Sequence, residues 1–370
     1  MSRRQGRGLP YDNRLKLGIF GANCSGGLAV TTVPERWSGS WEDNAALARL
    51  ADASGVEFLL PIARWRGYGG ETDFEGEALE TITWAGGLLA ITRRLTAFGT
   101  VHAPLVHPIF AAKQLATLDH MSAGRIGLNI VCGWNQDEFE MFGVEQRDHD
   151  ERYVYGAEWF DVVERIWSED APFDHRGRHL SLSNAIGNPK PWGDRRPIVM
   201  NAGGSPTGQA FGARHCDVLF TLLIDMEMGR KRVAELDDIA RNHGRVVEVF
   251  TTAYVVCRPT RREAEDYHHY YTVERGDEPA VERLMRLQGA HTKGREFLRR
   301  FRQRFAGGHG SYPLIGDPDD IAAELGRISA AGYAGTTIAF VNYLREFPYF
   351  RDEVLPRLER AGLRSTTGSR

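Results

Sequence analysis

Polar side chains interrupt two apolar runs of the sequence, at positions where they could meet a ligand. Thr100 and His102 stand two residues apart in the run 95–103, and Asn129 lies inside the run 125–134. If both runs are β-strands, Thr100 and His102 point to the same side, because side chains alternate along a strand. An inward hydroxyl or amide can hydrogen-bond a polar ligand. The alternative is an Asn129 amide satisfied by neighbouring backbone, since a buried amide needs partners in any structure.

Two further stretches carry groups suited to binding an anion. In NAGGSPTG (201–208), Gly204 and Ser205 stand directly before a predicted helix, where backbone N–H groups and the hydroxyl could cradle a phosphate. The stretch lacks the lysine of a P-loop and the last glycine of a nucleophile elbow. Arg152 and Tyr153 open another predicted helix, whose dipole favours an anion. Ordinary capping of that helix by its neighbouring aspartates is the alternative, and both roles can hold together.

Residues that follow other predicted strands suggest a compact substrate that is flat or anionic. Arg64 and Trp65 lie in a loop that mixes arginine, aromatic residues and glycine. His107 lies in the loop after the third predicted strand, Trp134 ends the fourth, and Cys24 follows the first. For the loop of Arg64 and Trp65, a plain surface loop is the alternative. Two histidines could ligate a metal, but no carboxylates with the usual spacing accompany them, so we expect no metal site.

Composition and charge narrow the class of protein. The chain has 370 residues and a net charge of −3, which gives no electrostatic reason to expect nucleic acid. Its four cysteines are widely spaced and form no C-x-x-C pair, so we expect the reduced thiols of a cytoplasmic protein. Residues 1–14 are basic, without the apolar core of a signal peptide, and are expected to be a flexible lead. No apolar run reaches the roughly 18 residues of a membrane span.

The elements that must position these residues alternate between strand and helix. The predicted strands are 15–23, 57–63, 95–103, 125–134, 196–204, 217–223, 246–257 and 335–342. The predicted helices are 41–55, 80–94, 108–124, 150–169, 207–216, 228–244, 317–332 and 350–362. A hairpin is predicted over 173–184, with its turn at Arg176-Gly177. Eight strands, each followed by a helix, indicate an α/β fold of the (β/α)8 TIM barrel type, with a doubly wound open sheet as the alternative.

The predicted barrel is one domain over 15–365, interrupted after strand seven. The segment 274–315 is polar and rich in arginine, and we expect an insertion that forms a mobile lid. A surface insertion without a role is the alternative. Because the active site of a TIM barrel lies at the carboxyl ends of its strands, the polar residues above should meet at the mouth of the barrel.

Four motifs occur in an order that points to one family: RGYGGETDF, HPIFAAKQLATLDHMSAGRIGLNIVCGW, DHDERY and NAGGSPTG. With them the chain resembles the bacterial-luciferase-like FMN-dependent monooxygenases. Within that family it is most similar to the branch of pyrimidine monooxygenase and of the dimethyl sulfone, dibenzothiophene sulfone and alkanesulfonate monooxygenases. The resemblance covers residues 15–260 well and the C-terminal strand and helix more loosely.

The resemblance implies reduced FMN, supplied by a separate NAD(P)H-dependent flavin reductase, with dioxygen as co-substrate. It also implies a homodimer or homotetramer. The positions that match the family's flavin contacts are Ile62, Ala63, Asn129, Glu138, Arg152, Tyr153, Gly204 and Ser205. The positions that match its oxygen pocket are Leu59, Thr100 and Asn129, with Trp134 at a pocket wall. His102 would be a proton donor or a substrate contact, because imidazole titrates near neutral pH.

The implied activity is oxidation or cleavage of a small organic molecule through a flavin (hydro)peroxide, at an amide C–N, C–S or C–halogen bond. Ala63 departs from the pyrimidine monooxygenase, which has a lysine there, and this makes a different substrate the expectation. Two other functions stay open. One is a deazaflavin-dependent oxidoreductase that transfers hydride on the same barrel, and the other is a flavin-binding relative without catalysis.

Overall fold

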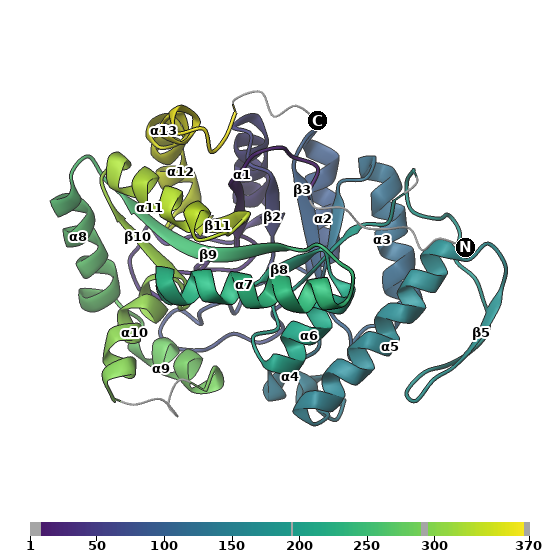
Figure 1. The fold of residues 1–370 in the computed structure, drawn as a ribbon. Coiled ribbons are helices and arrows are strands. Elements are labelled where there is room, and N and C mark those ends of the chain that lie inside the picture. The colour runs from purple at the N-terminus through teal and green to yellow at the C-terminus, as the bar shows by residue number, and fades with distance from the viewer. Residues whose placement is uncertain (1–8, 194, 290–294, 366–370) are drawn as a thin grey trace. The chain divides into compact units, whose positions relative to one another are not determined.

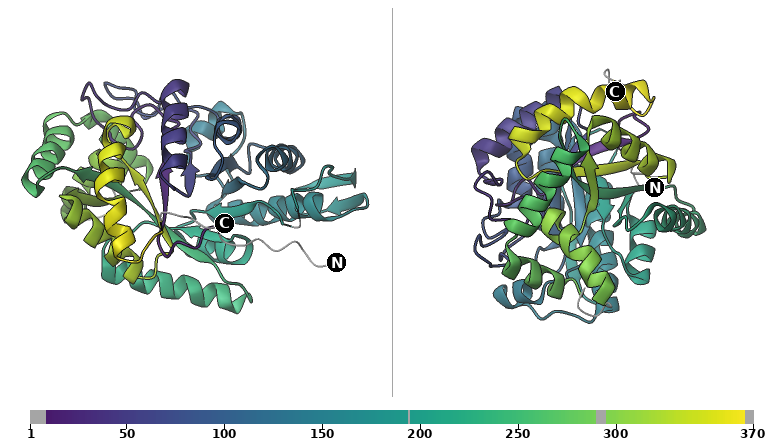
Figure 2. Two further views of the ribbon diagram at one scale, coloured as in Figure 1. Left: turned by 90° about the horizontal axis from the view of Figure 1, so that it is seen from above. Right: turned by 90° about the vertical axis from the view of Figure 1, so that its left-hand side faces the viewer.

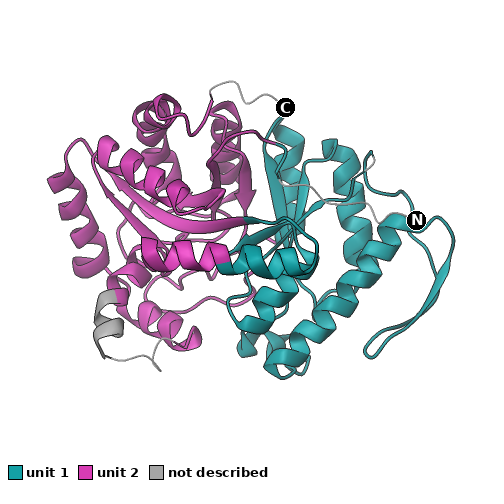
Figure 3. Ribbon diagram, in the orientation of Figure 1, with its two compact units in different colours: residues 1–10, 81–221, 235–248 teal, residues 11–80, 222–234, 249–370 magenta. Residues whose placement is uncertain are grey.

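The computed structural model describes residues 9–193, 195–289 and 295–365. The chain divides into two compact units, which are coloured separately in Figure 3. Unit 1 spans 1–10, 81–221 and 235–248, and unit 2 spans 11–80, 222–234 and 249–370. Each unit carries its own run of parallel strands, and each is described by itself below.

Unit 1 carries four parallel strands in the order β3-β4-β7-β8. They are β3 (Thr96–His102), β4 (Ile126–Val131), β7 (Ile198–Asn201) and β8 (Val218–Phe220). Nearly all their side chains are buried, as expected for parallel strands covered on both faces. The helices of this unit are α2 (Thr81–Ile91), α3 (Pro108–Ser122), α4 (Gln136–Met141), α5 (His149–Ser168) and α6 (Pro206–His215). Helix α7 (Met226–Asn242) has residues in both units.

An antiparallel hairpin of β5 (Phe173–Arg176) and β6 (Ser181–Ala185) confirms the prediction for 173–184. It lies beside α5 in Figure 1 and in the left-hand view of Figure 2. The carboxylate of Glu158 on α5 accepts hydrogen bonds from the backbone N–H groups of His179 and Leu180, at 2.9 and 2.8 Å. The turn of the hairpin is therefore anchored to the helix.

Unit 2 carries five parallel strands in the order β10-β9-β11-β1-β2. They are β1 (Lys16–Phe20), β2 (Phe58–Leu60), β9 (Glu248–Cys257), β10 (Tyr312–Gly316) and β11 (Gly335–Ala339). Its helices are α1 (Trp41–Ala53), α8 (Arg261–His269), the π-helix η1 (Tyr270–Glu274), α9 (Glu278–Leu287), α10 (Arg295–Gly308), α11 (Pro318–Ala330), α12 (Tyr343–Glu353) and α13 (Leu355–Arg360). All eight predicted strands are confirmed.

The last predicted helix, 350–362, was wrong at its start. Helix α12 begins at Tyr343, because the Asn342 side chain caps it by accepting a hydrogen bond from the backbone N–H of Arg345 at 3.1 Å. Pro348 then lies inside the helix, where proline normally ends one. A break after Glu353 separates α12 from α13.

The predicted insertion contains more regular structure than its polar composition indicated. Within 274–315 lie α9, α10 and most of β10, and β10 pairs in parallel with β9. Val281 and Leu284 of α9 and Phe305 of α10 are buried in a cluster with Tyr68 and Phe74 of the loop after β2. Much of this segment therefore packs onto that loop through an apolar face.

Candidate active site

Thr100 and Asn129 face each other across two paired strands of unit 1. They are register partners on β3 and β4, and Asn129 Nδ2 donates a hydrogen bond of 3.2 Å to Thr100 Oγ1. Both residues are buried, and Asn129 Oδ1 has no hydrogen-bond partner among the described residues. The alternative in which backbone alone satisfies the Asn129 amide is therefore wrong. A buried acceptor without a partner costs about 1–3 kcal/mol, which a ligand that donates to it would offset.

His102 and Glu138 form a second buried polar pair in unit 1. His102 ends β3, and its Nδ1 lies 4.0 Å from Oε2 of Glu138. Glu138 is almost fully buried on α4, a helix that the sequence analysis did not identify. The six-residue length of α4 explains the omission, because so short a segment gives almost no helical periodicity.

The residues predicted to bind an anion come together around the first turn of α6. Ser205 caps this helix by accepting a hydrogen bond of 3.1 Å from the backbone N–H of Gly208. The Tyr153 hydroxyl hydrogen-bonds with Ser205, and burial raises the pKa of Tyr153, so the phenol stays protonated at neutral pH. A side chain at Gly204 would meet no heavy atom within 4 Å. The backbone before α6 therefore leaves room for a ligand.

Arg152 adds a guanidinium in the first turn of α5. Its Nη1 donates a hydrogen bond of 2.6 Å to the carbonyl of Gly133, at the exit of β4, and its buried Nε has no hydrogen-bond partner among the described residues. Asp148 occupies the N-cap position of α5, but its side chain makes no capping hydrogen bond. The neighbouring Asp150 accepts from the Thr207 hydroxyl of α6 at 2.7 Å. The side chain of Asp148 therefore does not cap α5, and Asp150 bonds to α6. The unsatisfied Nε of Arg152 is compatible with binding of an anion at this turn.

In unit 2, the predicted residues gather where β2 ends. Leu59 is buried on β2, and Ile62 and Ala63 lie just beyond it. The side-chain amide of Asn23, fully buried after β1, accepts from the backbone N–H of Ile62 at 2.9 Å and donates to its carbonyl at 2.8 Å. Cys24 Sγ lies 3.9 Å from the same carbonyl. Asn23 therefore fixes the backbone of this turn, a role that the sequence analysis missed although the residue directly follows the first strand.

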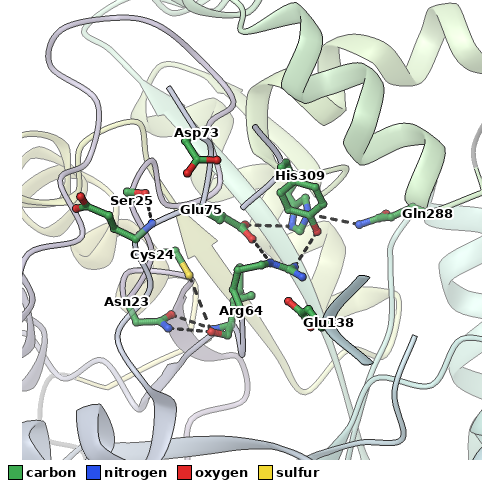
Figure 4. Close-up of polar contacts among 12 residues, drawn as sticks. Asn23, Cys24, Ser25, Arg64, Asp73, Glu75, Glu138, Gln288 and His309 are labelled. Carbon is green, nitrogen blue, oxygen red and sulfur yellow. Dashed lines mark hydrogen bonds and ion pairs between the residues drawn. The ribbon is translucent and has the colours of Figure 1, made fainter. Parts of the chain in front are cut away.

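Arg64 lies in the same turn and is buried, an expensive position for a guanidinium without partners. Its Nε donates to Oε2 of Glu75 at 2.9 Å, and its Nη2 donates to the Tyr68 hydroxyl at 2.7 Å (Figure 4). Trp65 is exposed to 40%. Arg64 and Trp65, predicted together as substrate contacts, therefore have different environments.

Two of the remaining predicted residues occupy more ordinary positions. His107 caps α3, since its Nδ1 accepts a hydrogen bond of 3.3 Å from the backbone N–H of Ile109. Trp134 is 38% exposed, directly after β4. The four cysteines are buried free thiols, as predicted. Within the described ranges no three His, Cys, Asp or Glu side chains are grouped to hold a metal, and no helix is both long and apolar enough to cross a membrane.

Known proteins resemble this chain over more than half of its length, and some over most of it. Residues 15–335 match the family model described as luciferase-like monooxygenase. An FMNH(2)-dependent dimethylsulfone monooxygenase of Pseudomonas fluorescens is 32% identical over 92% of this chain and 94% of its own length. A pyrimidine monooxygenase RutA of Pseudomonas syringae pv. syringae is 33% identical over 56% of this chain and 57% of its own.

The structure of riboflavin lyase (RcaE) superposes with a TM-score of 0.86, covers 96% of this chain and 94% of its own, and is 20% identical. Together with the strand order, this likeness confirms the predicted (β/α)8 TIM barrel of the luciferase-like type. The family model covers most of the chain, from the first predicted strand into the last. The chain belongs to the luciferase-like monooxygenase family.

Proposed function

We propose that this monooxygenase is the oxygenase component of a two-component system, which takes reduced FMN from a separate NAD(P)H-dependent flavin reductase. The observation that carries the proposal is the buried pair of Thr100 and Asn129, whose one unsatisfied acceptor lies where a barrel of this family has its site. The names of the relatives support the cofactor, since one acts as an FMNH(2)-dependent monooxygenase over nearly the same length.

The residues of unit 1 fit FMN in three respects. Asn129 Oδ1 is a buried acceptor that could receive an N–H of the flavin ring. The open backbone at Gly204, the Ser205 hydroxyl and the Tyr153 phenol provide space and donors for a phosphate. Arg152 adds positive charge beside them. The N-terminus of α6, a helix of 10 residues, favours a phosphate further through its dipole.

When bound, reduced FMN would supply the electrons that activate dioxygen for transfer of one oxygen atom to the substrate. Thr100 and Asn129 would hold polar groups of the ring, with the hydrogen bond between them already oriented. His102, next to Glu138, could hold a proton at the edge of this site. Ile62 and Ala63, fixed by Asn23, would present their backbone to the cofactor.

We further propose a small organic substrate that is oxidised or cleaved at an amide C–N, C–S or C–halogen bond. Relatives whose names specify dimethylsulfone and pyrimidine substrates support this range. Ala63, which replaces the lysine of the pyrimidine monooxygenase, makes a substrate other than a pyrimidine the better expectation. Trp134, which is 38% exposed after β4, is the proposed wall for a flat molecule.

An anaerobic titration with reduced FMN, followed by rapid mixing with oxygenated buffer, tests the proposal. We expect saturable binding of reduced FMN and flavin reoxidation that is kinetically distinct from that of free FMN. A protein that binds no reduced FMN, or that leaves its reoxidation at the rate of the free cofactor, would contradict the proposal. Titration with a reduced deazaflavin under the same conditions then distinguishes a hydride-transfer enzyme on the same barrel.

A further inference from the structure

Three buried side chains and the partly buried His309 form a closed ring of polar contacts in unit 2, after the turn at Ile62 and Ala63 (Figure 4). Glu75 accepts from Arg64 Nε at 2.9 Å, and Arg64 Nη2 donates to the Tyr68 hydroxyl at 2.7 Å. That hydroxyl lies 3.4 Å from His309 Nε2, and His309 Nδ1 lies 3.9 Å from Glu75 Oε1. Three members belong to the loop after β2, and His309 follows α10.

The hydrogen bonds determine where the proton of His309 lies. The side-chain nitrogen of Gln288 is 3.4 Å from His309 Nε2, and an amide nitrogen can only donate. With the amide in this orientation Nε2 accepts, which favours a neutral imidazole with its proton on Nδ1, toward the carboxylate of Glu75. Burial lowers the pKa of His309, and the nearby Arg64 lowers it further against the opposing effect of Glu75. The neutral form is the one that fits this ring.

The backbone around the ring is held in uncommon conformations. Glu75 and Asp73 have φ angles of 56° and 45°, and His309 has a φ of 56°, all in the left-handed region that non-glycine residues avoid. Glu75 Oε1 is also fully buried without a hydrogen-bond partner among the described residues, because 3.9 Å from His309 is too long. Local stability alone would not favour this combination, whereas a functional constraint would.

A second contact ties the same two segments together. Asp277, the N-cap residue of α9, is fully buried and accepts hydrogen bonds from the backbone N–H groups of Glu71 and Thr72 at 3.1 and 2.9 Å. The loop after β2 is thus attached to the segment 277–309 at both ends of that segment. Of these two attachments, the one at His309 involves an imidazole and depends on its protonation.

We propose that His309 is a positioning residue for the cofactor: through Tyr68 and Glu75 it holds Arg64, and thereby keeps the turn at Ile62 and Ala63 in the conformation that binds FMN. This inference rests on the proposed function. It links the segment that follows α10 to the cofactor site, although His309 itself need not touch the flavin. Protonation would add a donor at His309 Nε2, which faces the amide nitrogen of Gln288, and would place a second positive charge near Arg64, so acid should loosen the ring and release the turn.

The dissociation constant of oxidised FMN, measured by quenching of flavin fluorescence, tests this inference. The measurement runs from about pH 5 to about pH 8, because burial lowers the pKa of His309 and its protonation is expected at the acid end of this range. At pH 8 we expect His309→Ala to raise the dissociation constant about ten-fold, the scale of coupling within one hydrogen-bonded network. His309→Gln, which can still hydrogen-bond Tyr68 but cannot be protonated, should bind FMN within a few-fold of the wild-type protein.

The ratio of the dissociation constants of wild-type protein and His309→Gln is the decisive quantity, because ionisation of the FMN phosphate cancels in it. We expect this ratio to rise as the pH falls. His269→Gln is the matched control, since His269 also lies 3.9 Å from a glutamate, Glu274, but is exposed on α8. Tyr68→Phe should reproduce the loss seen with His309→Ala, and it decides the question if His309→Ala does not fold.

Two negative outcomes can be told apart. If the folded wild-type protein binds neither oxidised nor reduced FMN, the proposed function fails. If it binds FMN while the dissociation constants of His309→Ala and Tyr68→Phe are unchanged, and the ratio to His309→Gln is constant with pH, only the role of His309 is refuted.

Discussion

Asn129 Nδ2 donates a hydrogen bond of 3.2 Å to Thr100 Oγ1, between two residues that are direct register partners on β4 and β3. This contact sets the orientation of the Asn129 amide: its nitrogen faces the neighbouring strand, and its oxygen is the group without a partner. A polar pair of this kind inside a parallel sheet adds little to stability, because each net hydrogen bond contributes only about 1 kcal/mol. The hydrogen bond matters for function because it fixes the direction in which the acceptor Asn129 Oδ1 points.

The first prediction concerns this pair. Thr100→Val keeps the shape of the side chain and removes the hydroxyl, so the protein should fold and bind reduced FMN. Loss of one preorganised hydrogen-bonding group at a reacting centre typically costs a factor of about 10²–10³. We therefore expect the kinetics of flavin reoxidation and the yield of hydrogen peroxide to move to those of free reduced FMN.

Thr96→Val is the control for that measurement, because Thr96 is also buried and lies at the other end of β3. It should leave reoxidation unchanged. Wild-type reoxidation kinetics in Thr100→Val would show that the hydroxyl has no role in the reaction with oxygen.

The second prediction concerns the backbone before α6. Alanine at Gly204 meets no atom within 4 Å and should leave the free energy of unfolding almost unchanged. If a phosphate occupies that space, Gly204→Ala should weaken the binding of FMN by roughly ten-fold, the effect of about 1.4 kcal/mol. Binding of riboflavin, which has no phosphate, should not change.

A loss that is equal for FMN and riboflavin would mean that the methyl group disturbs the loop and not a phosphate site. The Ser205→Ala variant separates two further effects. It should also weaken FMN specifically, and in addition cost about 1 kcal/mol of stability through loss of the cap on α6.

The sequence was sufficient for the barrel, because its strands are buried and therefore apolar throughout. β3 and β4 have almost no exposed residue, and such runs, separated by amphipathic helices, leave few alternative folds. β10 was missed because three of its five residues are only partly buried, as expected of a strand at the end of the sheet order. The π-helix η1 was also missed, since hydrophobic periodicity gives no signal for it.

The position of a candidate residue could be predicted where it stands alone on a recognisable element, as with Ser205, which caps α6. Contacts between residues that are distant in the sequence could not be predicted. His309 and Tyr68 are 241 residues apart, and nothing local to either residue indicates the other. Asn23 satisfies the backbone of Ile62 across 39 residues, a contact that exists only after β1 and β2 have paired.

The third prediction concerns acid stability. His268 on α8 stacks on Tyr254 of β9 and lies 3.0 Å from its hydroxyl, and burial lowers the pKa of His268 to about 4. Because the unfolded chain holds this proton up to about pH 6.5, it binds more protons than the native state between these values. The contribution of the neutral imidazole to the free energy of unfolding is complete above pH 6.5 and is lost as the pH falls toward 4. The loss is of the order of 3 kcal/mol.

The free energy of unfolding in urea, measured at about pH 7.5 and about pH 4.5, tests this effect. The first value lies above the expected titration range of His268 and the second lies near its lower end. His268→Gln should lose less stability between the two pH values than the wild-type protein, since glutamine can accept from Tyr254 without being protonated. His243→Gln is the control, because His243 is exposed after α7. If His268→Gln and the wild-type protein lose equal stability, His268 does not contribute to acid unfolding.

The last prediction concerns a buried ion pair that attaches the end of the chain to β1 and β2. Arg364 Nη1 lies 2.9 and 2.8 Å from the two carboxylate oxygens of Glu57, and both side chains are almost fully buried. Glu57 also accepts from the Asn13 amide at 2.6 Å and from the backbone N–H of Leu17 at 2.9 Å. Removing one member of such a pair leaves an uncompensated charge and typically costs about 3–5 kcal/mol.

Arg364→Met should therefore lower the free energy of unfolding in urea by several kcal/mol, whereas Glu57→Gln combined with Arg364→Met should recover part of that loss, because no buried charge remains. FMN binding should be equal in both proteins once they are folded, since neither residue belongs to the proposed cofactor contacts. A loss below about 1 kcal/mol in Arg364→Met would mean that water reaches Glu57 as easily as in an exposed pair. The contact of Arg364 with Glu57 would then contribute little to the stability of the barrel.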